Sequence, residues 1–437
     1  MTMFPISKDR LGQIVSETGI SDIASATIRQ ICALAAALER EAGERFVHLE
    51  MGNPGIEAST IGVEAECAVL RDGIANKYPD ISGLPRLKKA GSEFLKAFVS
   101  IDVDPKGIVP TVGSMQGCFT MLLLLKQRQP GKDALLFINP GFPAQRNQAK
   151  ILGLEEVSFD IHDYRGKKLE AKLEELLSRG NITGILYSNP NNPAWTNLTE
   201  EELEIIGRMA TRYDAIVLED HAYCGMDFRT NYGTAGEPPF IPTVARYTDN
   251  YVILLSASKI FSYAGQRIAL VCMSPQVYSR RYEFFEKFYE MPRFGDAYIF
   301  GVLYTASSGT AHSAQYAMAA MLEAAVDGRL DFVGECSEYA RRCSRAKELF
   351  LSNGFHLVYA ADGDGRPVSD GFFFTAGYRD MTGEELQCAL IRHGVSTISL
   401  PSTGSEQRGV RVCVSMLDDD AVFVMLEERL KRFSDEY

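Results

Sequence analysis

Polar and charged residues that could take part in catalysis follow four short apolar runs of the sequence. They are Asn139-Pro140-Gly141-Phe142 after 134–138, Ser188-Asn189-Pro190-Asn191-Asn192 after 182–187, Glu219-Asp220-His221-Ala222-Tyr223 after 215–218, and Ser256-Ala257-Ser258-Lys259 after 252–255. Arg267 follows the lysine eight residues later. An aromatic ring, an amide, an acid, a lysine and an arginine are together the groups that one bound cofactor would need.

Each of these groups alone is weak evidence for a site. A lysine after a strand is usually a solvated strand end, and an Asp-x-Ala-Tyr segment is more often a turn. Their order is stronger evidence, because ligands of an open α/β sheet bind at the carboxyl ends of its strands. The sequence therefore predicts that the loops after successive strands form a single ligand site.

The surrounding pattern indicates a mainly parallel sheet that is covered by helices on both faces. From about 86 to 330, short apolar runs alternate with helical stretches, and 268–273 is a further apolar run. Strands that are buried on both faces are apolar throughout in this way. Thr199 with Glu202 three residues later is a capping box, which predicts a helix from there through Met209. The expected fold class is α/β.

A second, smaller α+β unit is expected from the two ends of the chain. A stretch rich in Ala, Ile and Leu predicts helix within 20–45, and a charged helix over 332–351 leads into shorter segments. We predict a large domain over 60–325 and a small domain formed by 1–59 together with 326–437. The sequence contains no flexible linker between the two units, so we expect them to pack tightly.

The composition is ordinary for a soluble globular protein and narrows the classes of function. Of the 437 residues, 46% are hydrophobic, and 45 Lys and Arg against 57 Asp and Glu give a net charge of −12. An acidic protein repels phosphate backbones and anionic lipids, so neither nucleic acid nor a membrane surface is an expected partner. The longest apolar runs are far shorter than the roughly 20 residues that a bilayer requires.

The cysteines indicate a reducing compartment. The sequence has 9 of them, scattered without a CxxC pair and without clustering near histidines. This pattern is typical of reduced thiols in a cytosolic protein, and it predicts neither a disulfide framework nor a metal site. The first residues contain no basic stretch followed by a long apolar run, so no signal peptide is expected. The expected location is cytoplasmic.

From Gly52 to Arg411, the order of the motifs resembles the class I and II aminotransferases, which are fold-type-I enzymes that use pyridoxal 5′-phosphate (PLP). The most specific element is Ser256-x-x-Lys259 with Arg267, combined with Asp220-x-Ala-Tyr223 thirty-nine residues before the lysine. The resemblance implies a large PLP-binding domain and a homodimer with shared active sites.

The resemblance also implies roles for five residues around the cofactor ring. Lys259 is similar to the residue that binds PLP covalently and then moves the proton between the substrate Cα and the cofactor. Asp220 resembles the acid that pairs with the pyridine nitrogen, and Tyr223 and Asn192 resemble the pair that hydrogen-bonds the phenolic oxygen. Phe142 matches the aromatic residue that stacks on the ring. The predicted catalytic residues are Lys259, Asp220 and Tyr223.

Other residues match the positions that bind the phosphate and the substrate. The predicted phosphate ligands are Ser114, Met115, Ser256 and Arg267, with Tyr78 supplied by the neighbouring subunit. Arg411 resembles the arginine that binds the substrate α-carboxylate, with Gly52 and Asn192 beside the substrate. The alternative for Arg411 is a surface residue at the start of an apolar strand.

The sequence departs from the family pattern at several positions. Ala194-Trp195 replaces the usual Thr-Gly after Asn192-Pro193, so the only tryptophan is expected beside the cofactor, where it could shape the substrate pocket or only pack. Gln145 stands where some members have a histidine behind the pyridine-binding acid. His221 is expected on the opposite side of its strand and without a role.

Two further expectations concern local geometry and specificity. Members of the family commonly have cis proline bonds at the matching strand ends, so cis peptides are expected at Asn139-Pro140 and Asn192-Pro193. Arg293 could contact a distal carboxylate of a substrate, although a solvent-facing position fits it better.

Three functions are candidates for a chain with these residues. The first is an aminotransferase that moves an amino group between an L-amino acid and a 2-oxo acid by a ping-pong mechanism. The second is another PLP enzyme on the same scaffold, namely a C–S β-lyase, a decarboxylase or a cyclopropane-forming synthase, which the sequence does not separate from the first. The third is the effector-binding half of a transcription regulator, which is disfavoured because the residues before Gly52 contain no basic recognition helix.

Overall fold

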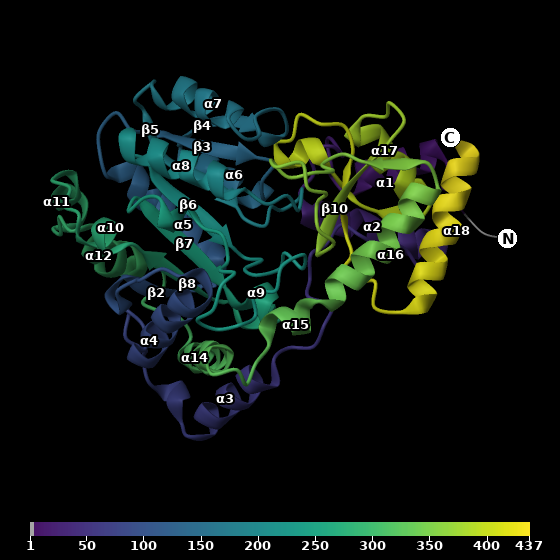
Figure 1. Ribbon diagram of the computed structural model, residues 1–437. Helices are drawn as coiled ribbons and strands as arrows, with labels where there is room; N and C mark the ends of the chain where they lie inside the picture. The colour runs from purple at the N-terminus through teal and green to yellow at the C-terminus, as the bar shows by residue number, and fades with distance from the viewer. Residues whose placement is uncertain (1–3) are drawn as a thin grey trace.

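The computed structural model describes residues 4–437, and its largest sheet lies between two layers of helices (Figure 1). The order of its strands is β2-β8-β7-β6-β5-β3-β4. Their bounds are β2 Ile108–Val112, β3 Ala134–Asn139, β4 Glu155–Asp160, β5 Ile182–Ser188, β6 Ile216–His221, β7 Tyr251–Ser256 and β8 Ile268–Met273. Only β8 runs antiparallel to its neighbours in this sheet. The expected mainly parallel sheet is confirmed.

Each face of this sheet has its own hydrophobic core. Leu218 and Leu254 enter one core, whereas Val217 and Ile253 enter the other. Because alternate residues of a strand point to opposite faces, strands between two cores must be apolar throughout. One core includes α5 Gly113–Gln127, α6 Pro143–Ile151, α10 Pro275–Ser279, α11 Phe284–Tyr289 and α12 Phe294–Asp296, and the other includes α4 Pro85–Phe94, α7 Lys168–Leu177, α8 Glu200–Arg212, α9 Ala257–Ile260 and α14 His312–Val326. α3 Thr60–Arg71 packs on α14. The short helix α13 Tyr304–Ser307 precedes α14 in the chain.

The two ends of the chain together form a second group of strands and helices (Figure 1). A parallel pair joins β1 Val47–His48 to β11 Val395–Ser396, and an antiparallel sheet has the order β12-β13-β10-β9. Its strands are β9 Phe355–Leu357, β10 Phe373–Tyr378, β12 Ile398–Ser399 and β13 Val410–Cys413, and the helices are α1 Lys8–Glu17, α2 Ile28–Ala42, α15 Phe332–Cys336, α16 Glu338–Ser352, α17 Gly383–Arg392 and α18 Asp420–Glu436. The division at 60 and 325 stays a prediction.

Several elements differ from the expected ones at their ends. β6 continues to His221, so Asp220 lies within the strand and not in the loop after it. The expected helix over 332–351 is two helices, α15 and α16, which meet at Ser337. The stretch 20–45 becomes helical only from Ile28, where Thr27 forms a capping box with Gln30. The capping box of Thr199 and Glu202 is confirmed, and it begins α8.

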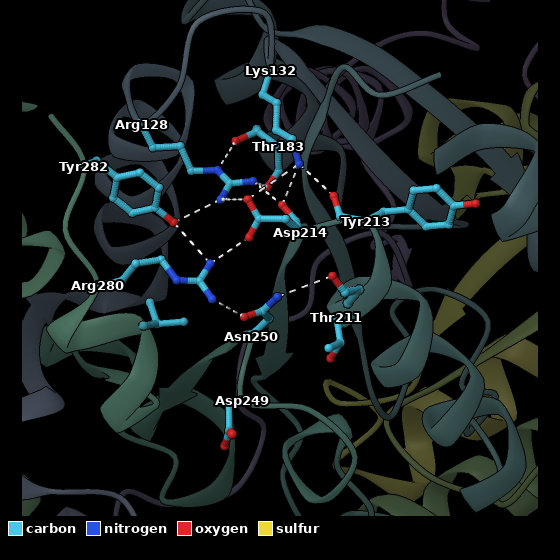
Figure 2. Close-up of polar contacts among 12 residues, drawn as sticks. Arg128, Lys132, Thr183, Thr211, Tyr213, Asp214, Asp249, Asn250, Arg280 and Tyr282 are labelled. Atoms are coloured by element: carbon cyan, nitrogen blue, oxygen red, sulfur yellow. Dashed lines mark hydrogen bonds and ion pairs between the residues drawn. The ribbon is translucent and has the colours of Figure 1, made fainter. Parts of the chain in front are cut away.

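A polar cluster joins the amino ends of the central strands, at the sheet edge opposite the predicted site (Figure 2). Asp214, just before β6, accepts hydrogen bonds from Arg128 Nη1 at 3.2 Å and Arg280 Nη1 at 2.7 Å. Lys132 Nζ donates to the Asp214 carbonyl at 2.7 Å. The Arg128 side chain is fully buried, so its charge depends on these partners. The cluster therefore fixes where β6 begins.

No helix within residues 4–437 is long and apolar enough to cross a membrane.

Candidate active site

Most of the predicted site residues lie at the carboxyl ends of β2, β3, β5, β6 and β7, where the small sheet adds Arg411 from β13. Ligands of parallel sheets bind at this edge. Asp220 shares the α5 face of the sheet with Leu218, whereas Glu219 and His221 point to the other face. The strand period thus directs the acid toward the face on which Gln145 of α6 contacts it.

Lys259 lies in α9, directly after β7. Its Nζ donates a hydrogen bond to the carbonyl oxygen of Gly52 and lies 5.2 Å from the centre of the Phe372 ring. Burial lowers the pKa of the Lys259 amine to about 8, and the positive charges of Arg411 and Arg267 act in the same direction. The neutral fraction of the amine at pH 7 therefore rises to roughly a tenth, far above that of an ordinary lysine, and the neutral amine is the nucleophilic form.

The Asp220 carboxylate is buried and accepts two hydrogen bonds. Gln145 Nε2 donates to Oδ2 at 2.8 Å, and the backbone N–H of Ala222 donates to Oδ1 at 3.1 Å. Burial raises the pKa of Asp220 to about 6. Within residues 4–437, no lysine or arginine forms an ion pair with this carboxylate, so the acid is available to a cationic ligand group.

Asn192 connects Tyr223 to Arg411. Its Nδ2 donates to the Tyr223 hydroxyl at 3.5 Å, and its Oδ1 accepts a hydrogen bond from Arg411 Nη1 at 3.3 Å. Both Asn192 and Tyr223 are buried. One amide therefore fixes two predicted site residues that are 188 positions apart in the sequence.

Arg411 is buried, with 1% of its surface exposed, so it is not the surface residue that was the alternative. Its Nη2 donates to the carbonyl oxygen of Glu50, and its guanidinium carbon lies 4.8 Å from the centre of the Phe373 ring. Burial lowers the pKa of Arg411 from its ordinary value. Its Nε has no partner within the described part of the chain. A buried guanidinium with a free N–H is suited to binding a carboxylate.

The start of α5 and Arg267 form a cradle for an anion. Gly113, the first residue of α5, has a φ of +67°, and a Cβ there would collide with the Arg267 guanidinium. The backbone N–H groups of Ser114 and Met115 are in the first helical turn, where the helix dipole favours negative charge. Ser256 lies at the end of β7, and its hydroxyl oxygen accepts a hydrogen bond from Ser258 N at 3.2 Å.

The sequence model for aminotransferase class I and II matches residues 46–427. The chain belongs to this family. Among curated relatives, it is 27% identical over 237 residues to an asparagine–oxo-acid transaminase of Streptococcus mutans, which covers 54% of this chain and 58% of the relative. It is 24% identical over 235 residues to an aspartate aminotransferase of Pyrococcus horikoshii, covering 54% of this chain and 57% of the relative. The chain thus matches somewhat more than half the length of these relatives.

Solved structures share the fold over almost the whole chain. An aspartate aminotransferase of Thermus thermophilus with maleate has a TM-score of 0.73 at 19% identity, covering 96% of this chain and 98% of that one. An aminotransferase from Mycobacterium tuberculosis has a TM-score of 0.76 at 19% identity, covering 94% and 96%. The predicted family and the predicted fold class are both confirmed.

Class I and II aminotransferases are PLP-dependent in general, and the residues of this chain fit that cofactor. The buried Asp220 lacks a cationic partner among the described side chains and would pair with a protonated pyridine nitrogen. Lys259 supplies an amine of lowered pKa. The cradle of Gly113 and Arg267 suits a phosphate. The donor set therefore matches the ring, the aldehyde and the phosphate of PLP.

The family resemblance also predicted local details, and several of these are present. Cis peptide bonds occur at both predicted positions, before Pro140 and Pro193, and also before Pro190, which was not predicted. Gln145 contacts the acid directly. His221 points to the far face, where its Nε2 lies 3.2 Å from Glu219 Oε2. Phe142, half-buried, is the residue just before α6.

Trp195 is fully buried and packs beneath the site. Its ring lies 5.3 Å from the Tyr223 ring in a T-shaped arrangement and 6.0 Å from the Phe373 ring. Its φ is +59°, which explains why glycine is usual at this position, and a Cβ on Gly371 would overlap the indole. Of the two possible roles, packing is the one that the structure supports.

Two of the residues singled out in the sequence are not brought into the site of this chain. Tyr78 is 93% exposed. Arg293 pairs with Asp296 at 3.1 Å, just before α12, and its side chain is 46% exposed, so the solvent-facing position is the observed one. Sequence reasoning also missed Glu50, which lies beside Arg411; the only available signal was an acidic residue two positions before Gly52.

Proposed function

We propose that the protein is a PLP-dependent aminotransferase that transfers an amino group between an L-amino acid and a 2-oxo acid by a ping-pong mechanism. The observation that carries the proposal is the placement of Lys259 and Arg411 around the carbonyl oxygens of Gly52 and Glu50. Gly52 and Glu50 are two residues apart, so one short backbone segment holds both the lysine and the arginine. A small α-amino acid could bind both with its Cα near the amine and its carboxylate at the guanidinium.

The residues divide the tasks of binding and proton transfer in this proposal. Arg411 binds the α-carboxylate and orients the substrate, because a planar guanidinium can donate to both carboxylate oxygens. Lys259 Nζ removes the proton from the substrate Cα, and its lowered pKa makes it a competent base. Asp220 holds the proton on the pyridine nitrogen. The bound cofactor supplies the electron sink for the developing negative charge at Cα.

Tyr223 and Asn192 complete the ring site. Asn192 holds the Tyr223 hydroxyl and Arg411 at once, so it couples the geometry of the cofactor site to that of the carboxylate site. Phe142 would stack on the ring, and Ser114, Met115, Ser256 and Arg267 would bind the phosphate. Gly52 would lie beside the substrate.

Transamination is favoured over the alternatives on the same scaffold. Both curated relatives described above are named as transaminases, and neither is named as a lyase, a decarboxylase or a cyclopropane-forming synthase. A glutamate–pyruvate aminotransferase of Escherichia coli is a further relative, at 26% identity over 235 residues.

A homodimer with shared active sites is part of the proposal. The support is an exposed aromatic side chain at Tyr78 and exposed apolar residues at Val112 and Tyr304. Val112 directly precedes Gly113, and a Cβ on Gly309 would lie 3.2 Å from Pro79, so the Tyr78 segment is next to the loop that follows α13. A second subunit seated there would be close to the phosphate cradle. The cytoplasmic location also stays a prediction.

The proposal is tested by reducing the purified, PLP-loaded protein with borohydride and mapping the labelled peptide. The expected result is one adduct per chain, on Lys259. A Lys259→Ala variant should bind PLP reversibly and should carry no adduct after reduction. An adduct on another lysine, or none, would overturn the assignment of Lys259.

A further inference from the structure

Glu50 is a buried acid beside the arginine that is assigned to the substrate carboxylate. Only 1% of its surface is exposed. Its carbonyl oxygen accepts a hydrogen bond from Arg411 Nη2, so the two residues are in direct contact. The negative charge of its side chain also acts on Arg411, partly offsetting the lowering of the arginine pKa by burial.

Only one oxygen of the Glu50 carboxylate has a hydrogen bond of ordinary length, and the Cys32 thiol lies near the carboxylate as well. Glu50 Oε1 lies 2.9 Å from His48 Nδ1, whereas Oε2 is buried without a hydrogen-bond partner within residues 4–437. Leaving a carboxylate oxygen buried and unpaired costs free energy, and an apolar side chain at this position would avoid that cost. Arg411 Nε is likewise buried without a partner. Arg411 thus has an unsatisfied donor at the proposed substrate-carboxylate site, and Glu50, whose backbone it contacts, has an unsatisfied acceptor.

His48 connects Glu50 to the surface. Its side chain is 34% exposed, and its Nε2 lies 3.7 Å from Glu39 Oε2 on α2. The hydrogen bond to Glu50 raises the pKa of His48 above its ordinary value. When His48 is protonated, its charge compensates that of Glu50, and the charge of Arg411 is left for a ligand.

We propose that Glu50 is a positioning residue that holds Arg411 through its backbone oxygen and, with its carboxylate, weakens the affinity of that arginine for α-carboxylates. The proposal rests on the proposed function, because it assumes that Arg411 binds the substrate. The negative charge of Glu50 affects the binding of the amino acid and of the oxo acid alike, because each substrate presents an α-carboxylate to Arg411. The consequence is faster release of both products.

Glu50→Gln tests the proposal, because it removes the charge and keeps the shape and the acceptor for His48. Pyruvate, 2-oxoglutarate and phenylpyruvate serve as probes, and the fluorescence of Trp195, which packs against the Phe373 ring beneath Arg411, reports binding. We expect all three dissociation constants to fall about tenfold, since a unit charge a few ångströms away in a protein has an effect of that size. KM should fall similarly, whereas kcat should not rise.

Glu39→Gln is the matched control, because it removes one acid from the same cluster without a contact to Arg411. Its constants should not fall, because the loss of Glu39 leaves His48 less protonated and therefore can only weaken binding. Constants that rise or stay unchanged in Glu50→Gln would overturn the proposal, because a merely structural glutamate would weaken binding when replaced.

Two further variants separate the possible failures. His48→Asn at pH 6 removes the charge that compensates Glu50, so it should weaken binding of the probes; unchanged binding would contradict the proposal even if Glu50→Gln does not fold. Arg411→Lys should weaken binding strongly. If Arg411→Lys binds the probes as well as the wild type does, the proposed function of Arg411 fails. If Arg411→Lys weakens binding and Glu50→Gln has no effect, only the inference about Glu50 fails.

Discussion

At the scale of single residues, burial sets the chemistry of the two central groups. It raises the pKa of Asp220 to about 6 and lowers that of Lys259 to about 8, because both charged forms lose hydration. Each group is therefore closer to neutrality than it would be in water. A ligand that brings a cation to Asp220 stabilises its ionised form.

Asp220→Asn should keep the fold and, at saturating PLP, the bound cofactor, but it should lose several orders of magnitude in turnover. An amide cannot hold a proton on the pyridine nitrogen, so the ring is a poorer electron sink. Gln145 can still hydrogen-bond the new side chain, which limits structural change. Steady-state kcat with the absorption spectrum of the bound cofactor is the measurement, and near wild-type turnover would remove Asp220 from the mechanism.

Cofactor affinity should fall as the pH falls through about 6. Below the pKa of Asp220 its carboxyl is neutral and offers no charge to a pyridinium, whereas above that pKa it is ionised and binding is favoured. Dissociation constants for PLP between pH 5 and 8 would show this step. The phosphate of PLP titrates in the same range, so the test is the difference from Asp220→Asn, which should lack the step. Identical profiles would contradict the assignment.

The sequence predicted the residues whose identity is tied to a local motif, such as Lys259 after β7 and Arg267 beyond it. It did not predict that Glu50 contacts Arg411, because this pair is 361 positions apart. Such contacts depend on how strands and loops from distant parts of the chain are aligned, and no spacing within the sequence encodes them.

At the scale of elements, the strands of the central sheet place their polar ends on one edge while a second cluster fixes the other edge. The apolar runs made the strands predictable, since burial on both faces leaves no polar positions. Their ends were less predictable. β6 continues through three polar residues because Glu219 and His221 pair on one face and Asp220 meets Gln145 on the other.

Asp214→Asn should destabilise the protein without affecting the site. It leaves Arg128 and Arg280 without their shared carboxylate (Figure 2), and Arg128 is fully buried. Asp214 is itself half exposed, so we expect a loss of about 1–3 kcal/mol in the free energy of unfolding. Urea unfolding measures it, with exposed Asp133→Asn as the control. An unchanged unfolding midpoint would show that water replaces the carboxylate.

At the scale of the whole molecule, the site needs both groups of elements, because Arg411 of the small sheet reaches Asn192 after β5. In the proposed dimer, the exposed Tyr78 would join the site of the neighbouring subunit. The single chain supplies Arg267, Ser256 and the α5 amides to a phosphate that carries nearly two negative charges, so a further donor can be accommodated.

Tyr78→Phe should weaken cofactor retention by about 1.5–3 kcal/mol, the size of one hydrogen bond to a charged group. Mixing a Tyr78 variant with Lys259→Ala and allowing subunits to exchange should give hybrid dimers with one intact site, so activity should exceed that of either parent. Exchange is verified independently with a tag on one variant. Absence of any gain despite exchange would place Tyr78 outside the neighbouring site.

The central claim is that the protein transfers an amino group and does not cleave the substrate. The most direct test mixes the PLP-loaded protein with a panel of ¹⁵N-labelled L-amino acids in the absence of an oxo acid, and quantifies the products. The account predicts, for at least one of them, one equivalent of the corresponding 2-oxo acid per site, with the label retained on the protein until a second 2-oxo acid accepts it. Sustained release of ammonia or carbon dioxide without an acceptor would contradict it.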